Sequence, residues 1–270
     1  MYRRDGRKSD ELRSITVIKN VFGYSAGSVL LEVGNTKVLC TVSMQGGGPH
    51  FLRGKKGAAW LSAEYAMLPH ATQVRTARAS SMFQRNGRSV EISRLIGRAL
   101  RTVVNLEVFQ DQTIMIDCDV LQADGGTRTA SITGAYLALY LAQQKWLELG
   151  VIEQTFLTDA VSAVSIGVIN GTCVLDPSYE EDHECEADFN FVIARSGTIV
   201  EIQGGAEKKP IPWDLFEQAR VLAIQGAKKW FALFDEHLED IEKIKRQTGQ
   251  QKDSMEVGSL FSLKNRRKQE

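Results

Sequence analysis

The sequence contains no run of about 18 or more apolar residues, and its four cysteines do not form a C-x-x-C pair. The first absence excludes a membrane-spanning helix. The second makes a zinc site improbable, so reduced core thiols are expected. The charged start, MYRRDGRKSDELR, is unlike a secretory signal peptide. With 43% hydrophobic and 24% charged residues, the chain is predicted to be globular and cytoplasmic, without a membrane partner.

Familiar phosphate-binding and nucleophile patterns are also missing. No Gly-Lys-Ser/Thr follows the glycines of residues 122–134, and no G-x-G-x-x-G is formed there. These absences disfavour a nucleotide-triphosphate loop and a dinucleotide fingerprint. No Ser/His/Asp arrangement indicates an activated side-chain nucleophile.

The same stretch, QADGGTRTASITG, nevertheless has the features of an anion site. The alternating residues 113–121 predict a strand before it, and small apolar residues at helical spacing predict a helix after it. Gly125 and Gly126 allow a close backbone approach, the helix start offers unpaired N–H groups, and Arg128 adds a permanent charge. Phosphate is the usual occupant of such a turn. An ordinary glycine turn with a threonine cap and a solvated arginine explains this stretch alone equally well.

The net charge of zero conceals an asymmetry. Residues 1–135 contain 18 basic and 11 acidic residues, whereas residues 136–270 contain 15 and 22. The basic half could bind a polyanion. Mutual attraction of the two halves within a fold or an oligomer is the simpler explanation of the charge counts.

The order of predicted elements indicates an α+β fold with much antiparallel pairing. Residues 28–44 predict a hairpin turning at 34–36, and 89–105 predict an amphipathic helix with Arg94, Arg98 and Arg101 along one face. Such an arginine stripe could meet RNA phosphates, although a solvated or salt-bridged face is more common. Further hairpins turn at 170–171 and 196–197, and a long helix begins near 213. We expect one domain over 1–245, with halves 1–145 and 146–245, and a frayed polar tail over 246–270.

The segment SYEEDHECEADFNF, residues 178–191, is rich in carboxylates. If residues 182–192 were extended, Asp182, Glu184, Glu186 and Asp188 would share one face and Cys185, Ala187, Phe189 and Phe191 the core face. A solvated edge strand would explain this pattern. Asp182 and Asp188 would lie roughly 20 Å apart on an ideal strand. They could share one Mg²⁺ only if the chain bends between them.

Six segments together resemble the ribonuclease PH family of phosphorolytic 3′-exoribonucleases. They are DGRKSDELR (5–13), GSVLLEVGNTKVLCTVS (27–43), WLSAEYAMLP (60–69), NGRSVEISRLIGRALR (86–101), IDCDVLQADGGTRTASITGAYLAL (116–139) and DPSYEEDHECEADFNFV (176–192). The resemblance implies an α/β sandwich like ribosomal protein S5 domain 2, with mixed sheets and packed helices, assembled as a homohexamer, a trimer of dimers.

The resemblance also implies a reaction. Inorganic phosphate, as co-substrate, removes nucleotides from the 3′ ends of tRNA precursors and other RNA and releases nucleoside diphosphates, reversibly. Phosphate binding is implied for Arg88, Gly126, Thr127 and Arg128. Catalysis and Mg²⁺ binding are implied for Asp182 and Asp188, either of which could instead be a general acid.

Departures from the family pattern are confined to a few positions. His70 replaces the arginine of LPRAT, GGAEK with Gly205 and Lys208 replaces GTAEG, and residues 3–7 read RRDGR rather than RPDGR. The segment holding His70, Arg75 and Arg78 is linked in the family to dimer contact and tRNA binding, so oligomer strength or RNA affinity is in question. The rival hypotheses are a catalytically silent RNA-binding ring subunit and a hydrolytic nuclease. The silent subunit predicts loss of the implied site residues, all of which are present. The hydrolytic nuclease calls for a denser metal-ligand cluster and a water-activating base.

Overall fold

The computed structural model describes residues 3–52, 57–78 and 87–264, with side chains up to residue 238 apart from His50. The chain divides into two compact units, residues 1–230 and residues 231–270. The first unit contains every strand among these described residues and the candidate site, and the second contains the C-terminal part of a long helix. None of the helices in these described ranges is long and apolar enough to span a bilayer.

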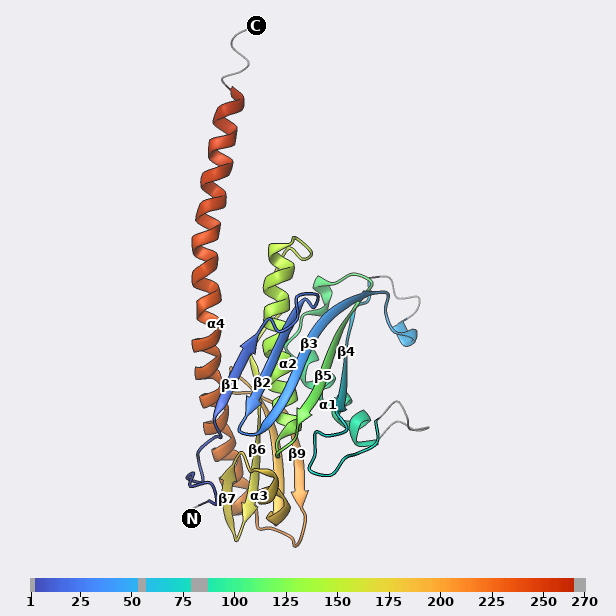
Figure 1. Cartoon of the computed structure of the whole chain (residues 1–270), viewed down its shortest axis with the longest axis vertical. Coiled ribbons are helices and arrows are strands. Elements are labelled where there is room, and N and C mark those ends of the chain that lie inside the picture. The colour runs from blue at the N-terminus through green and yellow to red at the C-terminus, as the bar shows by residue number, and fades with distance from the viewer. Residues whose placement is uncertain (1–2, 53–56, 79–86, 265–270) are drawn as a thin grey trace. The chain divides into compact units, whose positions relative to one another are not determined.

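The first sheet has five strands, in the order β1-β2-β3-β5-β4 (Figure 1). They are β1 (Ile15–Lys19), β2 (Gly27–Val33), β3 (Thr36–Gly46), β4 (Trp60–Met67) and β5 (Gln112–Gln122). The predicted hairpin is confirmed as β2 and β3, joined at Gly34-Asn35. β4 pairs with β5 in parallel, because the long connection between them, which contains helix α1 (Gly87–Arg101), returns the chain to the end of the sheet where β4 began, so that both strands run in the same direction.

The second sheet has four antiparallel strands, in the order β7-β6-β8-β9. They are β6 (Val161–Ile169), β7 (Thr172–Leu175), β8 (Ala187–Ala194) and β9 (Ile199–Ala206). The turns predicted at 170–171 and 196–197 are confirmed. One mixed sheet, one antiparallel sheet and the helices packed against them confirm the expected α+β fold.

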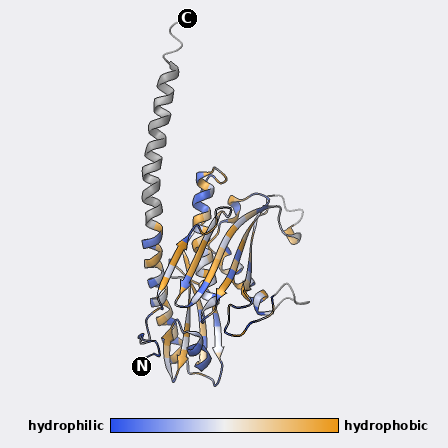
Figure 2. Ribbon diagram, in the orientation of Figure 1, coloured by the Kyte–Doolittle hydropathy of each residue, from blue (hydrophilic) through white to orange (hydrophobic). Residues whose placement is uncertain are grey.

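Helix α2 (Thr127–Glu148) lies between the sheets and contacts β2, β3, β5 and β6. Its side chains are buried on every face from Thr129 to Ala142, which its small residues make possible. Gly27 of β2 shows how close the approach is, since a Cβ there would lie 2.1 Å from the carbonyl oxygen of Ala138. Figure 2 shows the strands of the first sheet as mostly hydrophobic, as expected for a sheet covered by a buried helix.

Three sequence-based expectations need correction. Helix α1 ends at Arg101 rather than at 105, although Val103 is still buried. Helix α4 (Trp213–Lys264) continues through most of the segment expected to fray from 246. The division into a domain over 1–245 and a tail stays a prediction.

The third correction concerns the acidic segment. Residues 182–184 belong to a short helix, α3 (Tyr179–Glu184), and the strand begins only at Ala187. Ser178 caps this helix in a capping box with Glu181. A serine three residues before an acidic residue favours a helix start, and this signal outweighed the alternation. The core face is confirmed for Cys185, Ala187, Phe189 and Phe191, all of which are buried.

Ion pairs link the basic N-terminal segment to the acidic second half, as mutual attraction of the halves predicts. Arg3 pairs with Glu181 at 2.5 Å, with side chains only 1% and 6% exposed. Arg13 pairs with Asp176 at 2.6 Å, and Arg4 contacts Glu180 and Glu184. The N-terminal segment is therefore packed into the first unit through its arginines.

Replacement of Glu181 by Gln is expected to destabilise the protein at pH 7 by about 3–5 kcal/mol, because buried Arg3 loses its partner. Burial alone would raise the pKa of Glu181, but hydrogen bonds from Arg3 and Ser178 hold it below its ordinary value of 4.5. The stabilisation that ionised Glu181 gives the fold is complete above pH 4.5 and is lost as the pH falls through the folded-state pKa of Glu181. Urea unfolding from pH 7 to 3 should show the gap between wild type and E181Q closing, with E180Q as the exposed neighbouring control.

Candidate functional site

A cleft of about 980 Å³ opens between the start of α2, helix α3 and the ends of β8 and β9. Six residues singled out by the sequence line it together: Arg88, Gly126, Thr127, Arg128, Asp182 and Asp188. They come from positions up to 100 residues apart in the chain. The fold therefore brings the glycine turn and the acidic segment to one place.

The glycine turn connects the end of β5 at Gln122 to the start of α2 at Thr127. Gly125 and Gly126 have backbone φ values of +77° and +65°, which residues with a side chain rarely adopt. A Cβ on Gly125 would lie 2.6 Å from the carbonyl oxygen of Pro177, so only glycine lets this turn meet the segment leading into α3. No side chain caps the N-terminus of α2. Its first N–H groups and the positive end of its dipole therefore suit an anion in the cleft.

Two side chains of the turn are held in place by neighbours. The Thr127 hydroxyl lies 2.9 Å from the hydroxyl of buried Tyr65. Arg128 donates to Gln203 at 3.2 Å and to Glu91 at 3.4 Å. Burial raises the pKa of Tyr65, although Thr127 and the charges of Arg88 and Arg128 oppose the increase. The phenol therefore stays neutral beside the two cations.

The chain bends between the two aspartates, as a shared role for them requires. Asp182 lies on α3, Cys185 and Glu186 form the bend, and Asp188 lies on β8. The Cys185 thiol donates to the Glu181 carbonyl at 3.2 Å, and the Glu186 N–H donates to the Val168 carbonyl at 2.7 Å. Burial, and then the charges of Asp182 and Asp188, raises the pKa of Cys185 to about 12. The thiol is thus a neutral structural group.

Both aspartates have raised pKa values. Burial raises the pKa of Asp182, and the positive charges of Arg88 and Arg128 partly offset this. Burial also raises the pKa of Asp188, and the charges of Asp182 and Glu207 raise it further. Glu207 follows β9 and donates its N–H to the Glu186 carbonyl at 2.8 Å. The arrangement concentrates negative charge opposite two arginines, and added positive charge would stabilise it.

The remaining predicted residues lie outside the lining of the cleft. His70, Arg75 and Arg78 are exposed on the connection after β4, whose Thr72, Gln73, Val74 and Thr76 do line the cleft. Arg94 is exposed on α1. Arg98 is also exposed and donates to Glu201 at 2.7 Å, so this part of the arginine stripe forms an ion pair within the chain. Arg101 instead donates to the Leu61 carbonyl and lies over the Trp60 ring.

No cluster of three His, Cys, Asp or Glu residues able to hold a metal occurs among the residues the structure describes. The two aspartates nevertheless suit Mg²⁺, which needs only one or two carboxylates and keeps several waters. All four cysteines are free and buried, as expected.

Sequence reasoning missed several residues around the cleft. Tyr65 lies in a predicted strand and Arg13 in the charged N-terminal segment, and neither was assigned a role at the site. Glu207 lies in a segment noted only because it departs from the family pattern. Tyr65 alternates with buried Ala63 and Leu61, so its burial was predictable but its contact with Thr127 was not. Contacts between distant segments leave no local signal in a single sequence.

Two family models match the chain. The first, "3′ exoribonuclease family, domain 1", matches residues 11–145, and the second, "3′ exoribonuclease family, domain 2", matches residues 159–226. The glycine turn falls within the first match, and α3 and the acidic bend fall within the second. The two sides of the cleft are therefore contributed by different family domains.

Relatives support the same grouping over nearly their whole length. Ribonuclease PH from Dehalococcoides mccartyi is 47% identical over 231 residues, covering 86% of this chain and 95% of the relative. Ribonuclease PH from Syntrophomonas wolfei is 46% identical over 233 residues, covering 86% and 97%. A chain of the Archaeoglobus fulgidus exosome, solved with RNA bound to the active site, is 23% identical with a TM-score of 0.71, covering 86% and 92%. This last likeness shows the fold alone.

Proposed function

The chain belongs to the 3′ exoribonuclease family that includes ribonuclease PH, and on this premise we propose how its cleft carries out the family's reaction. The protein is a phosphorolytic 3′–5′ exoribonuclease and nucleotidyltransferase, with RNA and inorganic phosphate as its substrates. The observation that supports the mechanism is the meeting of an anion-binding turn with two aspartates in one cleft.

Phosphate is the nucleophile in the proposed mechanism. The N–H groups at the start of α2, the Thr127 hydroxyl and the guanidinium groups of Arg88 and Arg128 hold it beside the terminal phosphodiester. One phosphate oxygen bonds to the phosphorus while the bond to the 3′-oxygen of the preceding nucleotide breaks. The products are a nucleoside diphosphate and an RNA shortened by one nucleotide, whose 3′-oxygen takes up a proton. The arginines offset the repulsion between the phosphate ion and the phosphodiester, and the turn orients the phosphate ion for attack.

Asp182 and Asp188 are the proposed catalytic carboxylates and the proposed ligands of Mg²⁺. Their oxygen donors, open to the cleft and close enough to raise the pKa of Asp188, fit a hard divalent cation. A bound Mg²⁺ supplies neutralisation of charge on the reacting phosphorus and the leaving oxygen. The raised pKa of either aspartate also fits a general acid that protonates the 3′-oxygen.

The proposed RNA substrates are tRNA precursors and other RNAs with free 3′ ends. His70, Arg75 and Arg78 are exposed on the connection that lines the cleft, and Arg94 and Arg98 are exposed on α1. Their exposure supports the proposal that they contact an RNA strand or a second subunit. A homohexamer built as a trimer of dimers is the proposed assembly. A cytoplasmic location is proposed because four unpaired, buried thiols suit a reducing compartment.

The identity of the released nucleotide tests this function. The protein is incubated with a 3′-extended tRNA and Mg²⁺, with and without phosphate. Diphosphates that appear only with phosphate are expected. Monophosphates released without phosphate would identify a hydrolytic nuclease. RNA binding without any release would identify a catalytically silent subunit.

A further inference from the structure

Arg13, which precedes β1 and lies outside the cleft, donates hydrogen bonds from its backbone N–H and from all three side-chain nitrogens. The residue is buried, and its Nε and Nη2 atoms donate to the two carboxylate oxygens of Asp176 at 3.0 and 2.6 Å. The backbone N–H of Arg13 donates to the same carboxylate at 2.9 Å. Asp176 has a φ of +53°, a conformation that Asp tolerates better than most residues. The two residues therefore fix each other's side chain and backbone.

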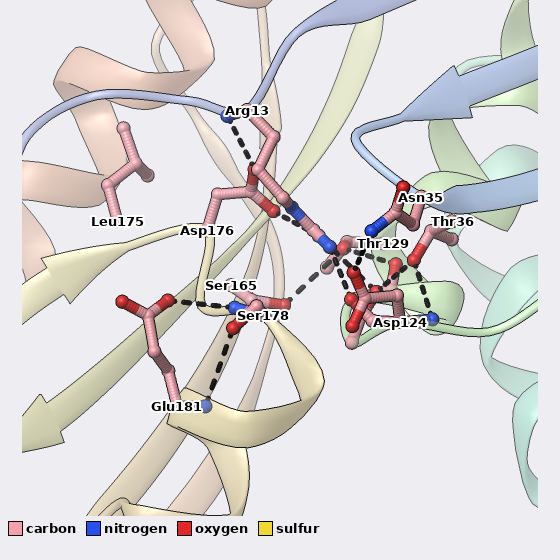
Figure 3. A network of polar contacts seen from close by, with 12 residues as sticks. Arg13, Asn35, Thr36, Asp124, Thr129, Ser165, Leu175, Asp176, Ser178 and Glu181 are labelled. Carbon is pink, nitrogen blue, oxygen red and sulfur yellow. Dashed lines mark hydrogen bonds and ion pairs between the residues drawn. The ribbon is translucent and has the colours of Figure 1, made fainter. Parts of the chain in front are cut away.

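The other edge of the Arg13 guanidinium holds the glycine turn. Nη1 donates to the carbonyl of Asp124, and Nη2 lies 3.3 Å from the carbonyl of Gly125 (Figure 3). These two peptide units directly precede Gly126, Thr127 and Arg128. A movement of either carbonyl would therefore shift the N–H groups that face the cleft.

The same network reaches the acidic side of the cleft. Asp176 lies two residues before Ser178, the N-cap of α3, and the Asp124 carboxylate accepts from the N–H of Tyr179 at 3.3 Å. Helix α3 carries Asp182. Arg13 and Asp176 thus form a rigid connection between the start of α2 and the start of α3.

The turn has a second support that does not depend on Arg13. The Thr36 hydroxyl donates to the Gly125 carbonyl at 2.7 Å and accepts from the Asp124 N–H at 3.0 Å. Asn35 donates to the Asp124 carboxylate at 3.1 Å. Removal of Arg13 should consequently displace the turn relative to α3 without unfolding it.

We propose that Arg13 and Asp176 are positioning residues for phosphorolysis, setting the distance between the phosphate-binding turn and the aspartates through the carbonyls of Asp124 and Gly125. This inference rests on the proposed function of the cleft. A buried ion pair is an inefficient means of stabilising a fold, whereas a displacement of about 1 Å at a reacting centre can cost about 100-fold in rate.

Two variants test the proposal. Arg13→Lys keeps the charge beside Asp176 but cannot reach both carbonyls, because an ammonium group has no planar fork. The double variant R13M/D176N removes both charges of the pair, so neither is left buried alone. The Asn side chain still offers an oxygen acceptor to the backbone N–H of residue 13, and Asn tolerates the positive φ. The matched control is R220M/E217Q, which removes an exposed pair on α4.

Both variants should raise the KM for phosphate by about 10-fold or more and lower kcat, with the KM for RNA changed by less than about 3-fold. The control should match wild type in all three constants. Either folded variant with the wild-type KM for phosphate and wild-type kcat would overturn the proposal. If the double variant unfolds, Arg13→Lys decides alone. Monophosphate release by wild type would instead overturn the proposed function itself.

Discussion

Replacement of Asp188 by Asn is expected to abolish turnover and at the same time to stabilise the fold. The loss of rate should be about 10²–10⁴-fold, because Asn has neither the negative charge that binds Mg²⁺ nor the titratable proton that a general acid transfers. The gain in stability should be about 1 kcal/mol, the usual scale when a strained active-site group is relieved. Both changes can be measured on one preparation, by phosphorolysis of RNA and by thermal unfolding.

The sign of the stability change follows from the pKa of Asp188. Burial and the charges of Asp182 and Glu207 raise this pKa in the folded state above its ordinary value of 3.8. The ionised carboxylate therefore opposes folding at every pH above the folded-state pKa, and the penalty vanishes as the pH falls below 3.8. The advantage of D188N should be largest near neutral pH and should disappear in acid.

Asp10→Asn is a matched control, since Asp10 is exposed and lies outside the cleft. It should change neither rate nor stability. A D188N protein with wild-type turnover would remove Asp188 from the site. A comparison of the Mg²⁺ dependence of D188N with that of D182N distinguishes the two roles, because loss of a metal ligand raises the Mg²⁺ concentration needed for half-maximal rate.

Replacement of Arg128 by Ala is expected to impair the use of phosphate far more than the binding of RNA. A hydrogen bond to a charged group contributes about 1.5–3 kcal/mol, which corresponds to a rise of about 10- to 100-fold in the KM for phosphate. Gln203 and Glu91 already orient the guanidinium at the edge of the cleft, so little ordering is needed when phosphate arrives. Kinetics at varied phosphate and fixed RNA, together with RNA binding in the absence of phosphate, measure the two effects separately.

The control for this variant is Arg220→Ala, which removes an exposed arginine that pairs with Glu217 on its own helix. Its KM for phosphate should equal that of wild type. Equal losses of phosphate use and RNA affinity in R128A would contradict the assigned role and favour a general electrostatic contact with RNA.

Most elements of the fold could be predicted because their signals are local. Alternating residues marked β5, and tight turns marked the hairpins at 34–35, 170–171 and 196–197. The parallel pairing of β4 with β5 carries no such signal, since it depends on how the long connection through α1 returns. The sequence thus predicted which segments form strands, but it did not predict that β4 pairs with β5.

The acidic segment shows how two local signals can conflict. Alternation predicted an extended strand from 182, but the Ser178–Glu181 capping box starts a helix that ends at Glu184. This error concealed the bend that brings Asp182 and Asp188 together. An extended chain would hold Asp182 and Asp188 roughly 20 Å apart, so a site that uses both requires the bend that the structure contains.

The N-terminal arginines illustrate what a single sequence does not reveal. Charge counts predicted attraction between the two halves of the chain but not which residues pair. Arg13 meets a carboxylate 163 positions away and two carbonyls more than 100 positions away. Such contacts arise only when both sheets and α2 are in place.

The central claim is that a free oxyanion binds at the start of α2, between Arg88 and Arg128. Arsenate has the charge and shape of phosphate, and arsenic scatters X-rays anomalously, so a crystal containing arsenate would locate the nucleophile directly. The account predicts one strong anomalous peak within hydrogen-bonding distance of the Thr127 hydroxyl and the Arg128 guanidinium, on the side that faces Asp182 and Asp188. A strong peak elsewhere, with no peak at this turn, would contradict it.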